Sequence, residues 1–295
     1  MQRHLPVCSK PPVRAGHRHI PGGAVSPWSS RKSLPRTLTV TACATLLAAL
    51  TSACSSTETT GKGGNEVELV SAGQLKTCTH LPYEPFQFRE GKKVVGFDVD
   101  LVDLVAKDLG VKQEIVDTPF EGIQSGEDLN ANKCDLAAAG MTITDVREKN
   151  VDFSAPYFEA TQALITKKGA DYKSLAGLKG KKLGVQESTT GAEYAKKNAK
   201  GVEQVTFEDV GLLLTAVQTG QVDAAINDNG VLYDYARKNK DTEVTAEFDT
   251  GEQYGIAVRT GNDALRKQID ETVKDAKADG RYDKIYKKWF GEEPK

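Results

Sequence analysis

Residues 139–158 read AGMTITDVREKNVDFSAPYF, and this stretch guides the interpretation of the rest of the chain. A strand-like run at residues 134–139 leads into a loop rich in Gly and Thr, and Arg147 follows on a polar turn. Arginine offers a planar, permanently charged fork that pairs with a carboxylate through two hydrogen bonds. The pattern indicates a site for a small carboxylate at the end of a buried strand. Taken alone, it is equally compatible with a surface turn in which Arg147 pairs with Asp145 or Glu148.

The first 53 residues have the features of an export leader. Residues 1–53 contain seven Lys or Arg and no Asp or Glu, and residues 38–50 form an apolar run. The run is shorter than the about 20 residues that span a bilayer, and its length and charge are typical of a signal-peptide core. The motif Leu-Thr-Ser-Ala-Cys that ends at Cys54 resembles a bacterial lipobox, although Thr51 stands where Leu or Val is usual. We expect an extracytoplasmic protein anchored to the cell membrane by a lipid on Cys54, with an ordinary secretory signal as the alternative.

The next segment, residues 54–65, is expected to be a flexible tether. After Cys54 it contains only Ser, Thr, Gly, Asn and charged residues, which cannot bury enough apolar surface to order the segment. We expect the folded part to begin near Glu66. Beyond residue 53 the chain has 32 Lys and Arg against 41 Asp and Glu, a net charge of −9. An acidic exported protein is a poor candidate for binding nucleic acid, and we expect no such partner.

Residues of the kinds that build common catalytic and metal sites are scarce beyond the leader. His80 is the one histidine there, and Cys78 and Cys134 are the cysteines that remain besides Cys54. A His-rich metal site is therefore excluded, and zinc-protease, phosphate-loop and dinucleotide motifs do not occur. We expect no metal and no cofactor. In an oxidising compartment Cys78 and Cys134 could form a disulfide, but their expected stagger on neighbouring strands leaves two buried thiols equally open.

The remaining residues alternate between strand-like and helix-like patterns, which predicts parallel sheets covered by helices. Strands are expected at residues 75–80, 112–118, 134–140, 182–186, 202–207 and 221–226. Helices are expected at residues 96–110, from 120, from 190, at 210–219, at 263–279 and at the C-terminus.

The pattern restarts near residue 174, which indicates two lobes of similar design. Apolar segments at residues 163–166 and 254–258 are expected to be the crossovers between the lobes. Lobe 1 would then comprise residues 66–163 and 254–295, and lobe 2 residues 164–253.

Four groups of candidate binding residues each follow an expected strand. They are residues 80–83, 140–147, 188–190 and 227–228. Ligands of open parallel sheets bind at the carboxyl ends of the strands. We therefore expect the four groups to meet at one site between the lobes.

Several spaced motifs occur in order along residues 66–291. They are GFDVDL at 96–101, GMTIT at 140–144 with Arg147, VDFS at 151–154 with Pro156 and Tyr157, DAA at 223–225 with Asp228, and YGIA at 254–257. With these motifs the chain resembles the amino-acid-binding proteins of ABC importers, solute-binding protein family 3. The resemblance implies an α/β fold of the two-lobed type II periplasmic-binding class, with parallel-type sheets flanked by helices and two hinge crossovers.

The resemblance also implies a role for each group of candidate residues. Arg147 would bind the ligand α-carboxylate, helped by Thr142 and by backbone N–H groups of Thr189 and Thr190, in agreement with an expected helix N-terminus as an anion site. Asp228, with the carbonyl of Gly140, would accept the α-ammonium; a strand-end cap is the alternative for Asp228. Residues implied at the side-chain end of the pocket are Tyr83, Phe120, His80, Gln186 and Asn227. Core packing is the alternative for the two aromatic residues.

His80 departs from the family pattern. Family members for basic amino acids tend to have Asp at this position. A histidine is a donor, and a partial cation when protonated, so it argues against Lys or Arg as ligand and favours Glu, Gln, Asp or Asn. Packing of a neutral His80 without a ligand role is the alternative.

Three functions are compatible with these patterns. The first is a monomeric receptor that closes on a polar amino acid and delivers it to the membrane permease of an ABC importer, with no enzymatic activity. The second is an enzyme on the same fold, such as a dehydratase of a prephenate-like acid, for which Asp228 or His80 would be the acid. The implied binding of both the carboxylate and the ammonium of an amino acid argues against this enzyme. The third is a sensory module that reports the ligand to a partner protein.

Overall fold

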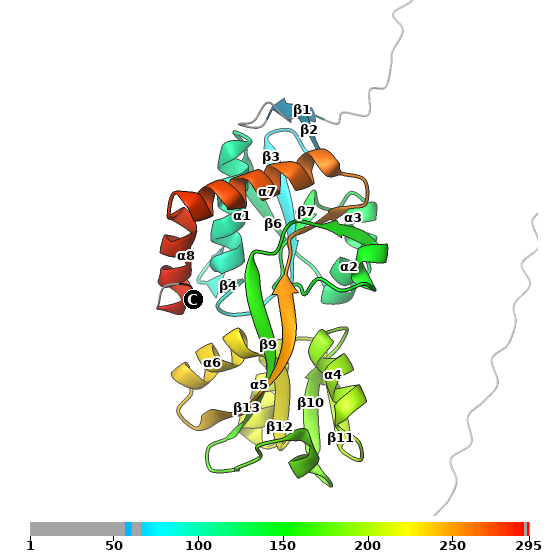
Figure 1. The fold of residues 1–295 in the computed structure, drawn as a ribbon, viewed down its shortest axis with the longest axis vertical. Coiled ribbons are helices and arrows are strands. Elements are labelled where there is room, and N and C mark those ends of the chain that lie inside the picture. The colour runs from blue at the N-terminus through cyan, green and yellow to red at the C-terminus, as the bar shows by residue number, and fades with distance from the viewer. Residues whose placement is uncertain (1–56, 61–65, 292–293, 295) are drawn as a thin grey trace, which may run out of the picture. The chain divides into compact units, whose positions relative to one another are not determined.

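The computed structural model describes residues 57–60, 66–291 and 294, and they form an α/β fold with two five-stranded sheets flanked by helices (Figure 1). The leader and Cys54 lie outside the described residues. Among the helices that are described, none combines the length and apolarity needed to cross a bilayer.

The sheet of lobe 1 has the strand order β6-β3-β7-β14-β8. Its strands are β3 (Gln74–Thr79), β6 (Lys112–Asp117), β7 (Leu136–Ala137), β8 (Val151–Phe153) and β14 (Ala257–Arg259). Its helices are α1 (Phe97–Asp108), α2 (Phe120–Gln124), α3 (Glu127–Asn130), α7 (Asp263–Ala278) and α8 (Arg281–Phe290). A hairpin of β4 (Phe88–Glu90) and β5 (Lys93–Val95) precedes α1. Strand β3 is parallel to β6 and β7, whereas β14 is antiparallel to β7 and β8.

The sheet of lobe 2 has the strand order β11-β10-β12-β9-β13. Its strands are β9 (Phe158–Lys167), β10 (Lys182–Gln186), β11 (Glu203–Phe207), β12 (Ala224–Asp228) and β13 (Thr242–Tyr254). Its helices are α4 (Thr190–Asn198), α5 (Val210–Thr219) and α6 (Asn229–Lys238). Strands β10, β11 and β12 are parallel, and β9 and β13 run antiparallel to their neighbours, so both sheets are mixed.

The antiparallel pair of β9 and β13 connects the two lobes (Figure 1). Residues 154–157 link β8 of lobe 1 to β9, and residues 255–256 link β13 to β14. The first crossover was expected at residues 163–166, and that position is wrong, because these residues pair with both β12 and β13 inside the lobe 2 sheet. The segment is apolar because it is a central, buried strand of that sheet.

A short strand occurs inside the segment that was expected to be an unstructured tether. Strand β1 (Thr57–Thr60) pairs antiparallel with β2 (Glu66–Leu69). For these four residues the expectation is wrong. Threonine is β-branched and favours strands, and the edge of β2 supplies hydrogen-bond partners that a tether would lack.

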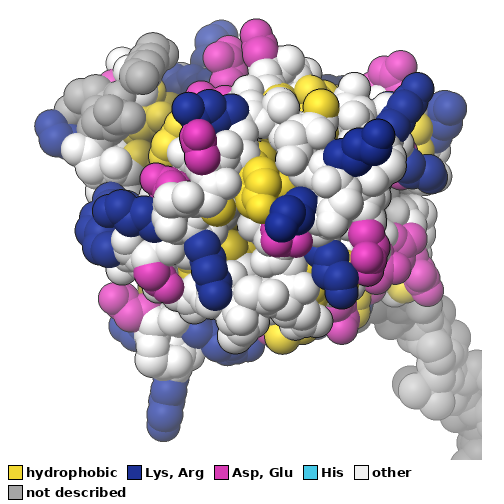
Figure 2. Space-filling model, turned by 90° about the horizontal axis from the view of Figure 1, so that it is seen from below, with side chains coloured by type: hydrophobic (Ala, Val, Ile, Leu, Met, Phe, Trp, Pro, Cys, Tyr) yellow, Lys and Arg dark blue, Asp and Glu magenta, His cyan; other side chains and the backbone are white. Residues whose placement is uncertain are grey.

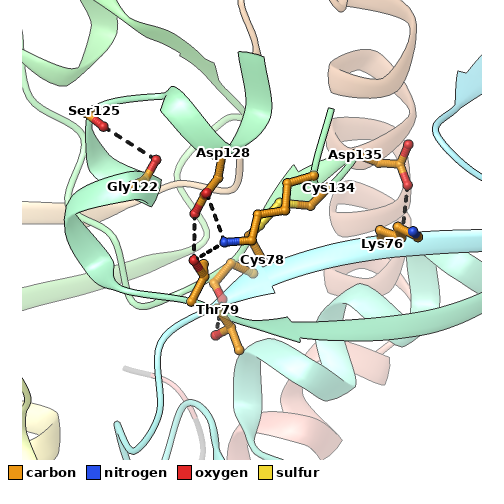
Figure 3. The surroundings of a disulfide bond; sticks show 11 residues. Lys76, Cys78, Thr79, Gly122, Ser125, Asp128, Cys134 and Asp135 are labelled. Atoms are coloured by element: carbon orange, nitrogen blue, oxygen red, sulfur yellow. Dashed lines mark hydrogen bonds and ion pairs between the residues drawn. A yellow bond between two sulfur atoms is a disulfide. The ribbon is translucent and has the colours of Figure 1, made fainter. Parts of the chain in front are cut away.

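Cys78 and Cys134 form a disulfide whose Cα atoms lie 5.6 Å apart (Figure 3). Cys78 is on β3, and Cys134 precedes the short strand β7, so the stagger of the two residues is smaller than the expected longer strand at 134–140 implied. The hydroxyl of Thr79, next to Cys78, donates to the carbonyl of Ala138 at 2.7 Å. The disulfide therefore joins the end of β3 to the segment that precedes β7.

The outer face of lobe 2 has charges of both signs. In Figure 2, which views the molecule from below, Lys and Arg alternate with Asp and Glu, and hydrophobic side chains form small separate areas. This face offers no continuous basic surface of the kind that binds nucleic acid.

Candidate ligand-binding site

A pocket lies between the lobes, at the ends of β3, β7, β10 and β12. It is lined by His80, Tyr83, Gln87, Phe120, Ala139, Gly140, Thr142, Arg147, Gln186, Thr189, Thr190 and Asp228. The structure thus brings together all four groups of candidate residues. Asn227 is the predicted site residue that does not line the pocket, while Gln87 and Ala139 line it without having been predicted.

Arg147 is buried and contacts both lobes. It lies on the short helix η1 (Arg147–Lys149) with 4% of its surface exposed. Its Nη1 donates to the carbonyl of Thr142 at 2.8 Å, and its Nη2 donates to the carbonyl of Ser188 in lobe 2 at 3.1 Å. Its guanidinium carbon lies 5.1 Å from the ring centre of Phe120. Arg147 is therefore buried and is not the exposed residue of a surface turn. Its N–H groups beyond these two hydrogen bonds can donate to a carboxylate.

Asp228 ends β12 and places a second charge in the pocket. It precedes α6, but its side chain does not cap that helix. The carboxylate accepts hydrogen bonds from the hydroxyl of Tyr83 at 2.6 Å, from the hydroxyl of Tyr254, and from the amide of Gln162. Burial, with the nearby charge of Glu252, raises the pKa of Asp228 to about 6. A buried carboxylate of this kind favours a cationic partner, such as an ammonium group.

Glu252 is a site residue that the sequence analysis missed. It lies on β13 with 9% exposure. One carboxylate oxygen accepts from the hydroxyls of Thr142 at 2.8 Å and Thr190 at 2.7 Å, and the other accepts from Gln162 at 3.0 Å and Thr250 at 2.9 Å. Four donors fill the acceptor capacity of an ionised carboxylate. The Thr142 hydroxyl, expected to donate to a ligand, donates to Glu252 instead.

Gln162, on β9, was also missed. Its amide nitrogen donates to Asp228 and Glu252 and so separates two carboxylates that would otherwise repel each other.

One feature of the sequence could have indicated Glu252 as a site residue. Glu252 is two residues before Tyr254 of the YGIA motif, so the two side chains lie on the same face of a strand.

The N-cap and the first residue of α4 line the pocket. Thr189 is its N-cap: the hydroxyl accepts from the N–H of Ala192 at 3.2 Å and donates to the carbonyl of Gln186 at 2.8 Å. The first-turn N–H groups of a helix have no partner within the helix and attract anions. Thr189 and Thr190 line the same pocket as Arg147, so these donors and the guanidinium lie around one space.

Gly140 allows the aromatic ring of Tyr83 to approach the backbone. Its φ angle is +56°, and a Cβ atom there would lie 2.8 Å from the Tyr83 ring. Its N–H donates to Asp98 at 2.8 Å, and burial raises the pKa of Asp98 to about 7. Glycine is required here both by the backbone conformation and by the close contact.

Asn227 contacts two residues that line the pocket, Tyr83 and Gln186. Its side-chain oxygen lies 2.9 Å from the Tyr83 hydroxyl, which shares its one proton between this oxygen and Asp228. Its amide nitrogen donates to the side-chain oxygen of Gln186 at 3.1 Å. Asn227 therefore orients two lining residues without lining the pocket itself.

His80 differs from expectation in the direction of its hydrogen bonding. Its Nδ1 lies 3.0 Å from the carbonyl of Thr118. A carbonyl only accepts, so Nδ1 is the donor, and Nε2 is an acceptor in the neutral form of the ring. His80 was expected to be a donor to the ligand; with Nδ1 occupied by the carbonyl of Thr118, the neutral form of the ring would instead be an acceptor.

Comparison with known proteins identifies the family of the chain. Residues 75–292 match the sequence profile of bacterial extracellular solute-binding proteins, family 3. The ABC transporter glutamine-binding protein GlnH of Bacillus subtilis is 39% identical over 210 residues, which are 68% of this chain and 75% of that protein. The structure of an ancestral arginine-binding protein bound to glutamine is 45% identical, with a TM-score of 0.71, and covers 75% of this chain and 100% of its own. An arginine-, lysine- and histidine-binding protein, ArtJ of Geobacillus stearothermophilus, is 37% identical, with a TM-score of 0.69, and covers 75% and 97% of the two chains.

Proposed function

Because the chain belongs to family 3 of the bacterial extracellular solute-binding proteins, we propose that it is the receptor of an ABC importer and binds a polar amino acid. The candidates favoured by the sequence are glutamine, asparagine, glutamate and aspartate. Relatives are named for glutamine, arginine, histidine and cystine. Membership of the family therefore does not identify which amino acid this chain binds.

The observation that carries the proposal is the pair of Arg147 and Asp228. The two residues have opposite charge, are buried, and line one pocket from different lobes. A buried charge is tolerated when it is paired. An amino-acid zwitterion would supply the carboxylate for Arg147 and the ammonium for Asp228, and would leave neither charge unpaired.

Closure of the lobes follows from the same contacts. Arg147 of lobe 1 reaches the carbonyl of Ser188 in lobe 2, and Tyr83 of lobe 1 reaches Asp228 in lobe 2. A ligand that docks on lobe 1 through Arg147, Tyr83 and Phe120 would complete its contacts only when lobe 2 approaches. Closure removes water and strengthens each charged contact. The closed form would then present both lobes to the permease.

The setting of the receptor is part of the proposal. We infer removal of residues 1–53, lipidation of Cys54, and a monomer on the outer side of the membrane. Lobe 1 would comprise the residues of the first sheet and its helices, and lobe 2 those of the second. A sensor protein is the second candidate partner that would bind the closed form.

A dehydratase is the competing proposal. One neighbour, 37% identical with a TM-score of 0.70, is an ancestral amino-acid-binding protein described as a precursor of cyclohexadienyl dehydratase. Asp228, with its raised pKa, would be the acid. The two tyrosine hydroxyls and the amide that donate to Asp228 favour its ionised form instead, which suits an ammonium partner.

The test is calorimetric titration of the purified full-length protein, unfolded and refolded to remove carried ligand, with each of the twenty amino acids. Binding of one or a few polar amino acids with a Kd of about 1 μM or lower, about 8 kcal/mol, is expected. Absence of binding by all twenty would overturn the proposal. Turnover of a prephenate-like acid would favour the enzyme.

A further inference from the structure

Two buried acceptors on residues that line the pocket have no hydrogen-bond partner among residues 66–291. They are Nε2 of His80 and Oε1 of Gln87. His80 is 9% exposed and Gln87 is 1% exposed, and both line the pocket. Buried polar atoms in proteins are nearly always paired, because an unpaired acceptor loses its hydration without compensation. The two atoms therefore point to donors that a ligand brings.

The surroundings of His80 set the tautomer of its neutral form, in which Nε2 is an acceptor. The ring donates from Nδ1 to the carbonyl of Thr118. The hydroxyl of Thr118 donates to Asp128 at 2.9 Å, so this loop is itself held in place. With Nδ1 used as the donor, the neutral ring presents only a lone pair at Nε2.

The orientation of the Gln87 amide is fixed in a similar way. Its nitrogen donates to the carbonyl of His80 at 3.4 Å. If the amide were reversed, its oxygen would face that carbonyl, and two acceptors would meet. The oxygen of Gln87 is therefore the atom without a donor, and Gln87 lines the same pocket as His80.

Charge supports the same conclusion. Arg147 contributes one positive charge to the site, and Asp228 and the adjacent Glu252 contribute two negative charges. An acidic side chain would add a further negative charge and would bring oxygen atoms to two acceptors. A cationic side chain would find no second carboxylate at this end, since Asp228 is the one acidic residue among those that line the pocket.

We propose that the pocket selects an amino acid whose side chain ends in a carboxamide, and that His80 and Gln87 accept its two N–H groups. This inference rests on the proposed function and narrows it. Of the four candidates, glutamine and asparagine fit, and glutamate and aspartate are rejected. The –NH₂ group has two donors, which matches the two free acceptors. A site built to hydrogen-bond such a group discriminates strongly against an analogue that lacks it.

The first experiment compares matched ligands on the wild-type protein. Calorimetry of the refolded full-length protein would use glutamine against glutamate and asparagine against aspartate, at pH 7. At least one amide should bind at least about 100-fold more tightly than its acid. Equal or tighter binding of both acids would overturn the inference, and so would tighter binding of arginine or lysine than of either amide.

The second experiment assigns the preference to the two residues. Gln87→Met and His80→Leu should each weaken binding of the preferred amide by about 10-fold or more, with a smaller effect on the acid, so the ratio of the two affinities narrows. Gln204→Met, at an exposed position on β11, is the matched control and should keep the wild-type ratio. An unchanged ratio in both pocket variants would overturn the roles of His80 and Gln87. If a variant does not fold, the wild-type ratio still decides the ligand class.

The outcomes separate the two proposals. If no amino acid binds, the proposed function fails. If an amino acid without a carboxamide binds best, the receptor stands and the selection by His80 and Gln87 fails.

Discussion

Arg147 of lobe 1 donates a hydrogen bond of 3.1 Å to the backbone carbonyl of Ser188 in lobe 2. The residue proposed to bind the ligand carboxylate is thus also a bridge between the lobes. We therefore expect a change at Arg147 to affect both ligand binding and lobe closure.

Replacement of Arg147 should abolish tight binding. In Arg147→Met the ligand carboxylate would be buried without its cation, which costs about 3–5 kcal/mol of binding free energy. Calorimetry would measure the loss. Arg259→Met is a control, since Arg259 lies on β14 and contacts Asn132 outside the pocket. Equal affinity of wild type and Arg147→Met would remove Arg147 from the site.

Affinity should fall at low pH because Asp228 must be ionised to bind the α-ammonium. Its pKa of about 6 in the ligand-free site lies above the usual value of 3.8. Below pH 6 a proton competes with the ligand, and affinity should fall roughly tenfold for each further pH unit. Titrations between pH 5 and 8 would show this slope, and Asp228→Asn should bind weakly without it. A flat profile in the wild type would contradict the role of Asp228.

Addition of one methyl group at Gly140 should disturb the pocket. In Gly140→Ala the new Cβ would lie 2.8 Å from the Tyr83 ring, at a φ of +56°. Tyr83 would have to move from Asp228, and binding should weaken by about 10-fold or more, since each unit of 1.4 kcal/mol is tenfold. Gly169→Ala is the matched control, because it also has a positive φ, +82°, but no atom within 4 Å of the added Cβ. Similar affinities for the two variants would show that the close contact with Tyr83 is unimportant.

Loss of the disulfide should reduce stability more than binding. Cys78 and Cys134 are 56 residues apart in the chain, and a cross-link of this span stabilises by about 2–4 kcal/mol. Urea unfolding of the Cys78→Ser, Cys134→Ser double variant should show that decrease in the free energy of unfolding. A reductant should destabilise the wild type and leave the double variant unchanged. No difference between the two proteins would indicate that the bond has no stabilising role.

Much of the fold and most of the residues that line the site could be predicted because their signals are local. Alternating patterns located strands such as β10 and helices such as α5, and the loop motif located Arg147 at the end of a strand. Helix α6 was not expected, and β12 continues through Asp228 rather than ending before it.

What the sequence could not show depends on which strands become neighbours. Glu252 and Gln162 come together only because β13 pairs with β9 along the hinge. The acceptor role of His80 depends on the carbonyl of Thr118, which β6 brings beside the end of β3. Neither the contact of Gln162 with Glu252 nor that of His80 with Thr118 can be predicted from periodicity or from a motif.

The claim that the site binds both charges of an amino acid is tested most directly by ligands that lack one of them. Calorimetry would compare the tightest-binding amino acid with its α-carboxamide, which lacks the carboxylate charge, and with its analogue without the α-amino group. The account predicts that each derivative binds at least about 100-fold more weakly, about 3 kcal/mol, because Arg147 or Asp228 is left buried and unpaired. Binding of either derivative with the affinity of the parent amino acid would contradict it.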